Sequence, residues 1–62
     1  MMYKILVAED ENSADEATAL LENMVNEYLQ NGWQMQGGVS LVYDATLETY
    51  SAVQAMIKEK NK

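Results

Sequence analysis

The fold of this chain is decided by residues 13–32, which read SADEATALLENMVNEYLQNG. Ser13 suits the N-cap position of a helix, and Glu16, three residues on, completes a capping-box pattern. At the other end, Gly32 can adopt the left-handed conformation that closes many helices. The segment therefore predicts one helix over about residues 13–31.

Apolar side chains recur through this segment at helical spacing. They are Ala17, Leu20, Leu21, Met24, Val25, Tyr28 and Leu29. Such a stripe lies on one side of a helix and packs against another layer of structure, while polar residues fill most of the remaining surface. We therefore expect an amphipathic helix that packs on a sheet.

The segments on either side of the helix have strand character. Residues 3–8 contain consecutive apolar residues, as in a strand covered on both faces. Residues 33–43 alternate between apolar and polar, and the pair Gly37-Gly38 interrupts the alternation. Two glycines inside a strand predict a bulge.

The C-terminal part of the chain predicts a loop over residues 44–48 and a third strand over residues 49–58. The Ala, Gln, Met and Lys residues of that last segment also favour a helix, so a helical alternative remains open. As a strand, it carries apolar residues on both sides: Val53, Ala55 and Ile57 on one, and Tyr50, Ala52 and Met56 on the other.

Together these elements predict an α+β fold. We expect a single β-α-β-β domain over residues 1–62, with one helix packed on a three-stranded, mainly antiparallel sheet and a polar tail at residues 58–62. One helix covers only one face of such a sheet, and uncovered apolar surface usually marks an interaction site. The pattern therefore predicts a homo-oligomer.

Composition excludes several classes of site. The chain has no cysteine, histidine or arginine, which removes disulfides, the usual zinc ligands and the base that a serine nucleophile needs. We expect no catalytic residues, no cofactor and no metal site. A net charge of −6 without arginine disfavours direct binding of nucleic acid.

The chain has no apolar run long enough to cross a membrane and no signal segment, so we expect a cytoplasmic protein. A domain of this size often needs stabilisation by a disulfide, a metal ion or a partner subunit. Without cysteine or a zinc site, the ordinary source of that stabilisation is a partner subunit. This consideration also favours an oligomer.

An acidic stretch, residues 9–11, follows the first expected strand. Residues 4–12 resemble the opening of a response-regulator receiver domain, but Asp44 is the only later aspartate after the helix and the chain is too short for that fold. Together with Asp15 and Glu16 these acids form a weak candidate for Ca²⁺ or Mg²⁺, without the spacing of an EF-hand. A polar turn that leads into a helix explains them better.

A second resemblance covers nearly the whole chain. It rests on the Gly32-Trp33 junction, on residues 37–40, which read GGVS, and on residues 54–58, which read QAMIK. In these features the chain resembles the small bacterial and phage proteins grouped as domain of unknown function 1737. The resemblance implies a compact β-α-β-β domain and implies no activity, cofactor or catalytic residue.

The candidate ligand or interface residues are Trp33, Gly37, Gly38, Tyr43, Tyr50 and Met56. Trp33 is better explained as a core anchor where the helix meets the next strand. We expect a small acidic accessory or binding protein that contacts a partner protein. The alternatives are a small-molecule, nucleotide-like binder with pockets between subunits, and an acidic DNA mimic that uses Glu16, Glu22 and Glu27.

Overall fold

The computed structural model describes residues 1–59 and shows four elements in the predicted order. They are β1 (Met2–Asp10), α1 (Ala14–Gln30), β2 (Gln34–Asp44) and β3 (Thr49–Lys58). The α+β class and the β-α-β-β order are confirmed, and the last segment is a strand rather than a helix. Of the polar tail predicted at residues 58–62, Lys58 belongs to β3 and residues 60–62 lie outside the described residues.

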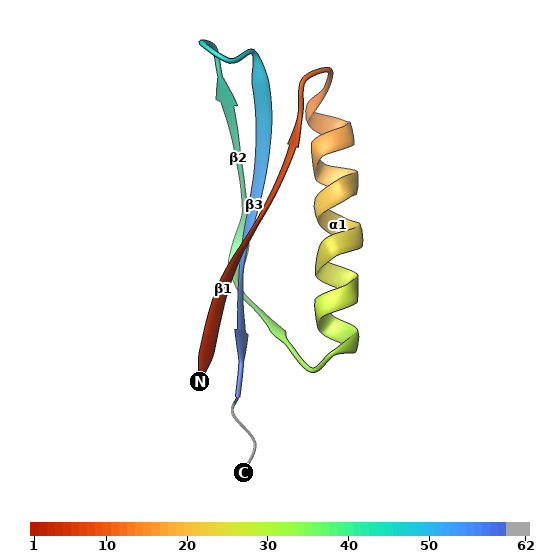
Figure 1. The fold of residues 1–62 in the computed structure, drawn as a ribbon, viewed down its shortest axis with the longest axis vertical. Coiled ribbons are helices and arrows are strands. Elements are labelled where there is room, and N and C mark those ends of the chain that lie inside the picture. The colour runs from red at the N-terminus through yellow and green to blue at the C-terminus, as the bar shows by residue number, and fades with distance from the viewer. Residues whose placement is uncertain (60–62) are drawn as a thin grey trace.

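The three strands form one sheet in the order β1-β3-β2 (Figure 1). The central strand β3 is antiparallel to both neighbours, which confirms the predicted antiparallel pairing. The β1–α1 and β2–β3 connections lie at one end of the molecule, and the N-terminus lies at the other end with the last residues of β3 (Figure 1).

The helix begins with hydrogen bonds that the sequence predicts only in part. The Ser13 side chain accepts a hydrogen bond from the backbone N–H of Glu16 at 3.1 Å, as in a capping box. The N–H of Ser13 donates to the carboxylate of Asp10 at 2.9 Å. In a full capping box, the side chain of Glu16 would accept this hydrogen bond instead. The N–H of Asn12 donates to the same Asp10 carboxylate at 2.8 Å. These two backbone donors hold the pKa of Asp10 below its usual value of 3.8.

The helix ends in the conformation that its glycine predicts. Gly32 has φ +89°, its N–H donates to the carbonyl of Leu29 at 3.2 Å, and the N–H of Trp33 donates to the carbonyl of Tyr28 at 3.0 Å. This pair of bonds is a Schellman motif. The rings of Tyr28 and Trp33 meet edge to face, with centroids 5.5 Å apart. Trp33 thus closes the helix–strand corner and packs against the core.

The core lies between α1 and the two strands β1 and β3. Its buried residues are Leu6, Ala8, Ala17, Leu21, Val25, Ala52 and Met56. The helix packs mainly on β1 and β3, and β2 is exposed along its whole length. The sheet is therefore wider than the one helix that covers it.

Candidate functional site

The two faces of the sheet differ in what covers them. Residues that pair directly across antiparallel strands share a face, so the pairs Leu6–Gln54 and Ala8–Ala52 place buried residues under the helix. The pairs that alternate with them in the register, Ile5–Ala55 and Val7–Val53, point to the opposite face. No element of the described chain, residues 1–59, packs on that second face.

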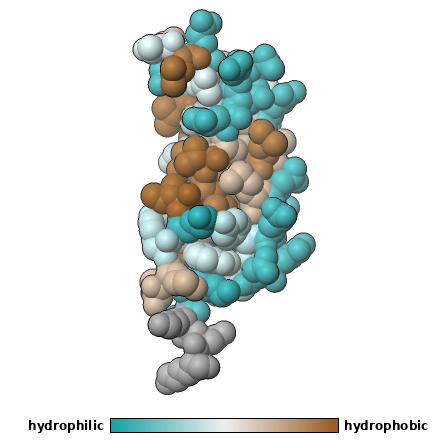
Figure 2. Space-filling view, in the orientation of Figure 1, coloured by the Kyte–Doolittle hydropathy of each residue, from teal (hydrophilic) through white to brown (hydrophobic). Residues whose placement is uncertain are grey.

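We call this second face the open sheet face. Its apolar residues are Tyr3, Ile5, Val7, Val42, Val53, Ala55 and Ile57. The residues on the edge strand β1 are half exposed, with Ile5 at 53% and Val7 at 47%. The residues on β3 are partly buried by their neighbours in the sheet. In the space-filling view, hydrophobic side chains gather over the middle of the sheet, beside the largely hydrophilic helix (Figure 2).

The open sheet face corrects one expectation about the first strand. Its consecutive apolar residues predict a strand covered on both faces, and within one chain only Leu6 and Ala8 are covered. The other apolar residues of β1 face solvent. A partner that covers the open sheet face would complete the burial that this sequence pattern predicts.

Polar residues bound the open sheet face on two sides. On β2, Gln34, Gln36 and Ser40 pair with Ile57, Ala55 and Val53 respectively and form a polar rim, which the exposed Val42, opposite Ser51, interrupts. Beyond the apolar rows, Glu9 and Asp44 lie on the same face near the two connecting loops. An apolar centre with a polar rim is the usual anatomy of a protein–protein interface.

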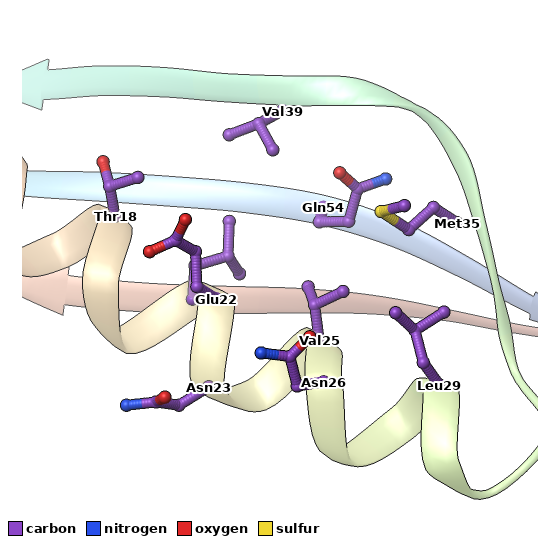
Figure 3. A pocket seen from close by; sticks show the side chains of 10 residues that line it. Thr18, Glu22, Asn23, Val25, Asn26, Leu29, Met35, Val39 and Gln54 are labelled. Atoms are coloured by element: carbon purple, nitrogen blue, oxygen red, sulfur yellow. The ribbon is translucent and has the colours of Figure 1, made fainter.

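A second surface is a groove between α1 and β2, which we call the α1–β2 groove. It has a volume of about 490 Å³ and is lined by Thr18, Leu21, Glu22, Asn23, Val25, Asn26, Leu29, Met35, Val39 and Gln54 (Figure 3). It exists because the helix does not extend over β2. Its helix side is mixed in polarity, and Met35 and Val39 form its β2 side.

Gln54 is a functional candidate that the sequence analysis did not single out. Its side chain is buried, and Nε2 donates to the carbonyls of Gly37 at 3.1 Å and Ala55 at 2.9 Å, with a longer contact to Gln36 at 3.4 Å. The signal was present in the sequence, because a glutamine stands on the otherwise apolar side of β3 between Ala52 and Met56.

The predicted bulge at the glycine pair lies opposite Gln54. The register shifts between Gln36 and Ser40, so three residues of β2 face one residue of β3. Gly37 has φ +77°, a conformation that side chains with a Cβ rarely adopt. The bulge prediction is confirmed, and the carbonyls that the bulge releases from the ladder are bound by the Gln54 amide.

The structure does not bring all the predicted site residues together. Tyr43 and Tyr50 lie side by side with ring centroids 4.7 Å apart. Trp33 lies at the other end of β2, roughly 30 Å from Tyr43 at the rise of a strand. Met56 is 0% exposed and belongs to the core, so it is not available to a ligand or partner in this structure.

The described chain holds neither a metal cluster nor a membrane-spanning helix. Among residues 1–59, no group of three acidic side chains lies close enough together to hold a metal ion. In the same part of the chain, α1 lacks the length and apolar character of a membrane span.

Comparison with known proteins gives the family. The model of a family described as "Domain of unknown function (DUF1737)" matches residues 1–59. The chain belongs to this family. The match extends from β1 to the end of β3 and therefore covers the whole β-α-β-β unit. The searches of curated proteins and of solved structures found no match.

Proposed function

We propose that this protein is a homo-oligomeric binding protein that acts through protein–protein contacts, and that its copies meet at the open sheet face. The observation that carries the proposal is the uncovered apolar centre of that face, with Ile5 and Val7 half exposed. Contiguous apolar patches of this kind on small soluble domains usually mark contact surfaces.

The size of the face supports a modest interface. Three strands of about ten residues, at spacings of about 4.8 Å and 3.3 Å, present roughly 450 Å² per chain. Two such faces together bury roughly 900 Å², which lies at the low end for specific protein contacts. The proposal is therefore an oligomer that forms in a concentration-dependent way.

The test is sedimentation velocity over a range of micromolar concentrations. We expect a species heavier than the 7.0 kDa monomer, and we expect Ile5→Lys to dissociate it because a charge would be buried. The matched control is Leu41→Lys, because Leu41 is 51% exposed on β2 but pairs with Ala52 on the helix side of the sheet. A wild-type monomer throughout the range would overturn the proposal.

The proposal also includes a partner protein that is not a second copy of this chain. A separate experiment tests this part. Affinity purification from cells that make the protein is expected to recover one stoichiometric partner. The chain has no cysteine, which agrees with the cytoplasmic location that is part of the proposal. The proposal also includes a bacterial or phage source. This part rests on the family resemblance in residues 37–40 and 54–58.

A second candidate function is the binding of a small molecule. The observation that favours it is the α1–β2 groove, whose volume of about 490 Å³ is typical of ligand sites. The side-chain hydrogen bonds of Gln54 to Gln36, Gly37 and Ala55 all use Nε2, which leaves its Oε1 as an acceptor beside the groove. This groove lies within one chain, unlike the pockets between subunits that the sequence suggested.

Thermal-shift measurements against nucleotides and neutral aromatic compounds test this second candidate. A ligand that binds only the folded state raises the Tm, and Val39→Trp should abolish the rise because the larger side chain fills the groove. A flat response across the compounds would count against small-molecule binding.

The acidic DNA mimic receives no specific support from the helix. At about 100° per residue, Glu16 and Glu27 share one side of α1 and Glu22 lies about 120° away. The three carboxylates therefore do not form one row with the spacing of phosphates.

A further inference from the structure

The end of α1 contains the dipeptide Asn31-Gly32, in which a side-chain amide precedes the least hindered backbone nitrogen. Such a pair reacts without an enzyme. The nitrogen of Gly32 attacks Cγ of Asn31, and the new C–N bond closes a five-membered succinimide ring. The C–N bond of the side-chain amide breaks, and ammonia leaves with the proton that the Gly32 N–H gives up through solvent. Water then opens the ring and leaves an aspartate or an isoaspartate at position 31.

The folded helix end holds both reacting groups in hydrogen bonds. The side-chain amide of Asn31 donates to the carbonyl of Glu27 at 2.8 Å. The N–H of Gly32 donates to the carbonyl of Leu29 at 3.2 Å. This N–H must lose its proton before the nitrogen can attack, and its hydrogen bond to Leu29 withholds that proton from solvent.

The backbone conformation of Asn31 also separates the two groups. Ring closure requires the nitrogen of Gly32 to lie beside Cβ of Asn31, as seen along the Cα–C bond. Asn31 has ψ 17°, which places that nitrogen beside the backbone nitrogen of Asn31 instead, away from the side chain. The reaction therefore requires the hydrogen bonds of this turn to open and ψ to rotate.

We propose that Asn31-Gly32 is a site of spontaneous deamidation that the Schellman motif protects, and that the reaction proceeds when the last turn of α1 opens locally. Helix ends open at a lower free energy than the core, without unfolding of the whole domain. Asn31 and Gly32 are both exposed, so water reaches the site as soon as the turn opens.

The product does not fit the turn that protected the asparagine. A carboxylate at position 31 has no proton to donate to the carbonyl of Glu27, and its charge lies at the negative end of the helix dipole. The last turn carries no basic residue, and an exposed ion pair with Lys58, which lies beside Gly32, contributes little. Isoaspartate also adds an atom to the main chain inside the loop that the Leu29–Gly32 hydrogen bond closes. Deamidation therefore weakens the helix end.

Peptide mapping by mass spectrometry tests the protection. The protein is incubated at mildly alkaline pH, either folded or unfolded in urea, and the fraction of aspartate and isoaspartate at position 31 is followed with time. We expect the folded protein to react at least about tenfold more slowly than the unfolded protein, because only the open turn reacts. Equal rates would overturn the protection, and no reaction in urea would overturn the site itself.

Two variants separate local from global opening. Trp33→Leu removes the ring contact with Tyr28 that braces the helix end, and it should raise the rate in the folded protein several-fold. Gly37→Ala weakens the fold at the bulge, away from this turn, and should leave the rate unchanged. Urea denaturation gives the global stability of both variants. A rise that follows global stability in both would overturn local opening.

Hydrogen exchange of the Gly32 amide, measured by NMR, gives the opening of the turn in the wild-type protein itself. This amide should exchange faster than the amides of the core strand β3, and exchange as slow as theirs would contradict local opening. In Asn31→Asp, which reproduces one product, the Gly32 amide should exchange several-fold faster than in the wild type. The matched control is Asn31→Gln, which keeps a neutral amide. An unchanged rate in Asn31→Asp would overturn the weakening of the helix end.

Discussion

Gly37 and Gly38 are adjacent, yet the structure needs a glycine only at the first of them. Gly37 has φ +77°, whereas Gly38 does not adopt a positive φ, and an added Cβ would meet nothing within 4 Å at either position. Steric crowding therefore plays no part, and the backbone conformation alone separates the two residues.

We expect Gly37→Ala to lower the free energy of unfolding by about 1 kcal/mol, because a Cβ disfavours the left-handed conformation. Gly38→Ala is the matched control, and it should leave stability unchanged or raise it by up to about 0.5 kcal/mol through the unfolded state. Urea denaturation of the two variants measures both changes. Equal losses would show that the bulge does not depend on the conformation of Gly37.

Asp10 links the pH to the stability of the helix N-terminus. Backbone hydrogen bonds from Ser13 and Asn12 lower its pKa below 3.8 in the folded state. A group whose folded pKa is depressed stabilises the fold above its unfolded pKa, and this contribution is lost as the pH falls through the folded pKa.

We therefore expect Asp10→Asn to be less stable than the wild type at neutral pH. The difference between them should hold down to about pH 5 and shrink as the pH falls below 3.8. Urea denaturation of both proteins from pH 7 to pH 2.5 gives this difference. A difference that does not change over this range would contradict the role of the Asp10 carboxylate.

At the scale of elements, one buried side chain connects β3 to the bulge of β2. Gln54 donates to the carbonyls of Gly37 and Ala55. It is buried between Ala52 and Met56 on the helix side of β3, where the pattern of the strand calls for an apolar residue. Loss of this amide would leave the partly buried carbonyl groups of Gly37 and Ala55 without this donor, at a cost of about 1 kcal/mol.

We expect Gln54→Met to lower the free energy of unfolding by this amount, and Gln30→Met, at an exposed helix position, to change it by less than about 0.5 kcal/mol. Gln54→Glu should be worse at neutral pH, because a buried carboxylate would face carbonyl oxygens, and should recover partly as acid protonates it. Denaturation at pH 7 and pH 4 measures both effects. A Gln54→Met protein as stable as the wild type would show that the amide is not needed.

The elements differ in how far the sequence predicts them. The bounds of α1 follow from local signals, namely the cap at Ser13 and the glycine at position 32. Residues 49–58 are apolar on both sides and also favoured a helix, and it is their pairing with β1 and β2 that makes them a strand. The strand order β1-β3-β2 is set by pairings between distant residues, which periodicity does not report. The α1–β2 groove depends on that order, so the sequence did not predict it.

The candidate interaction surface was partly predictable at the scale of the whole molecule. The apolar residues on both sides of β3 predicted an uncovered face, and Val53, Ala55 and Ile57 do lie on it. The proposed residues Trp33, Tyr43 and Tyr50 do not, because Tyr43 and Tyr50 lie on the helix side and Trp33 lies beside Tyr28. Register and burial, rather than residue type, decide which side of the sheet an aromatic ring occupies.

If copies associate through the open sheet face, the stability of the whole molecule should depend on protein concentration. Association favours the folded state by mass action, so a hundredfold rise in concentration should raise the Tm by roughly 5–10 °C. The Ile5→Lys protein should melt at the same temperature at both concentrations. Scanning calorimetry or circular dichroism gives both values, and a wild-type Tm that is independent of concentration would contradict the association.

The central position of β3 has a consequence for the order in which the fold can form during synthesis. Neither β1 nor β2 has a hydrogen-bonding neighbour until residues 49–58 have left the ribosome, because the two strands pair only with β3. The nascent chain can form its helix early, but the sheet has to wait for its middle strand. A ribosome that stalls before this segment would release a chain with two unpaired strands, which is the kind of product that aggregates or is degraded.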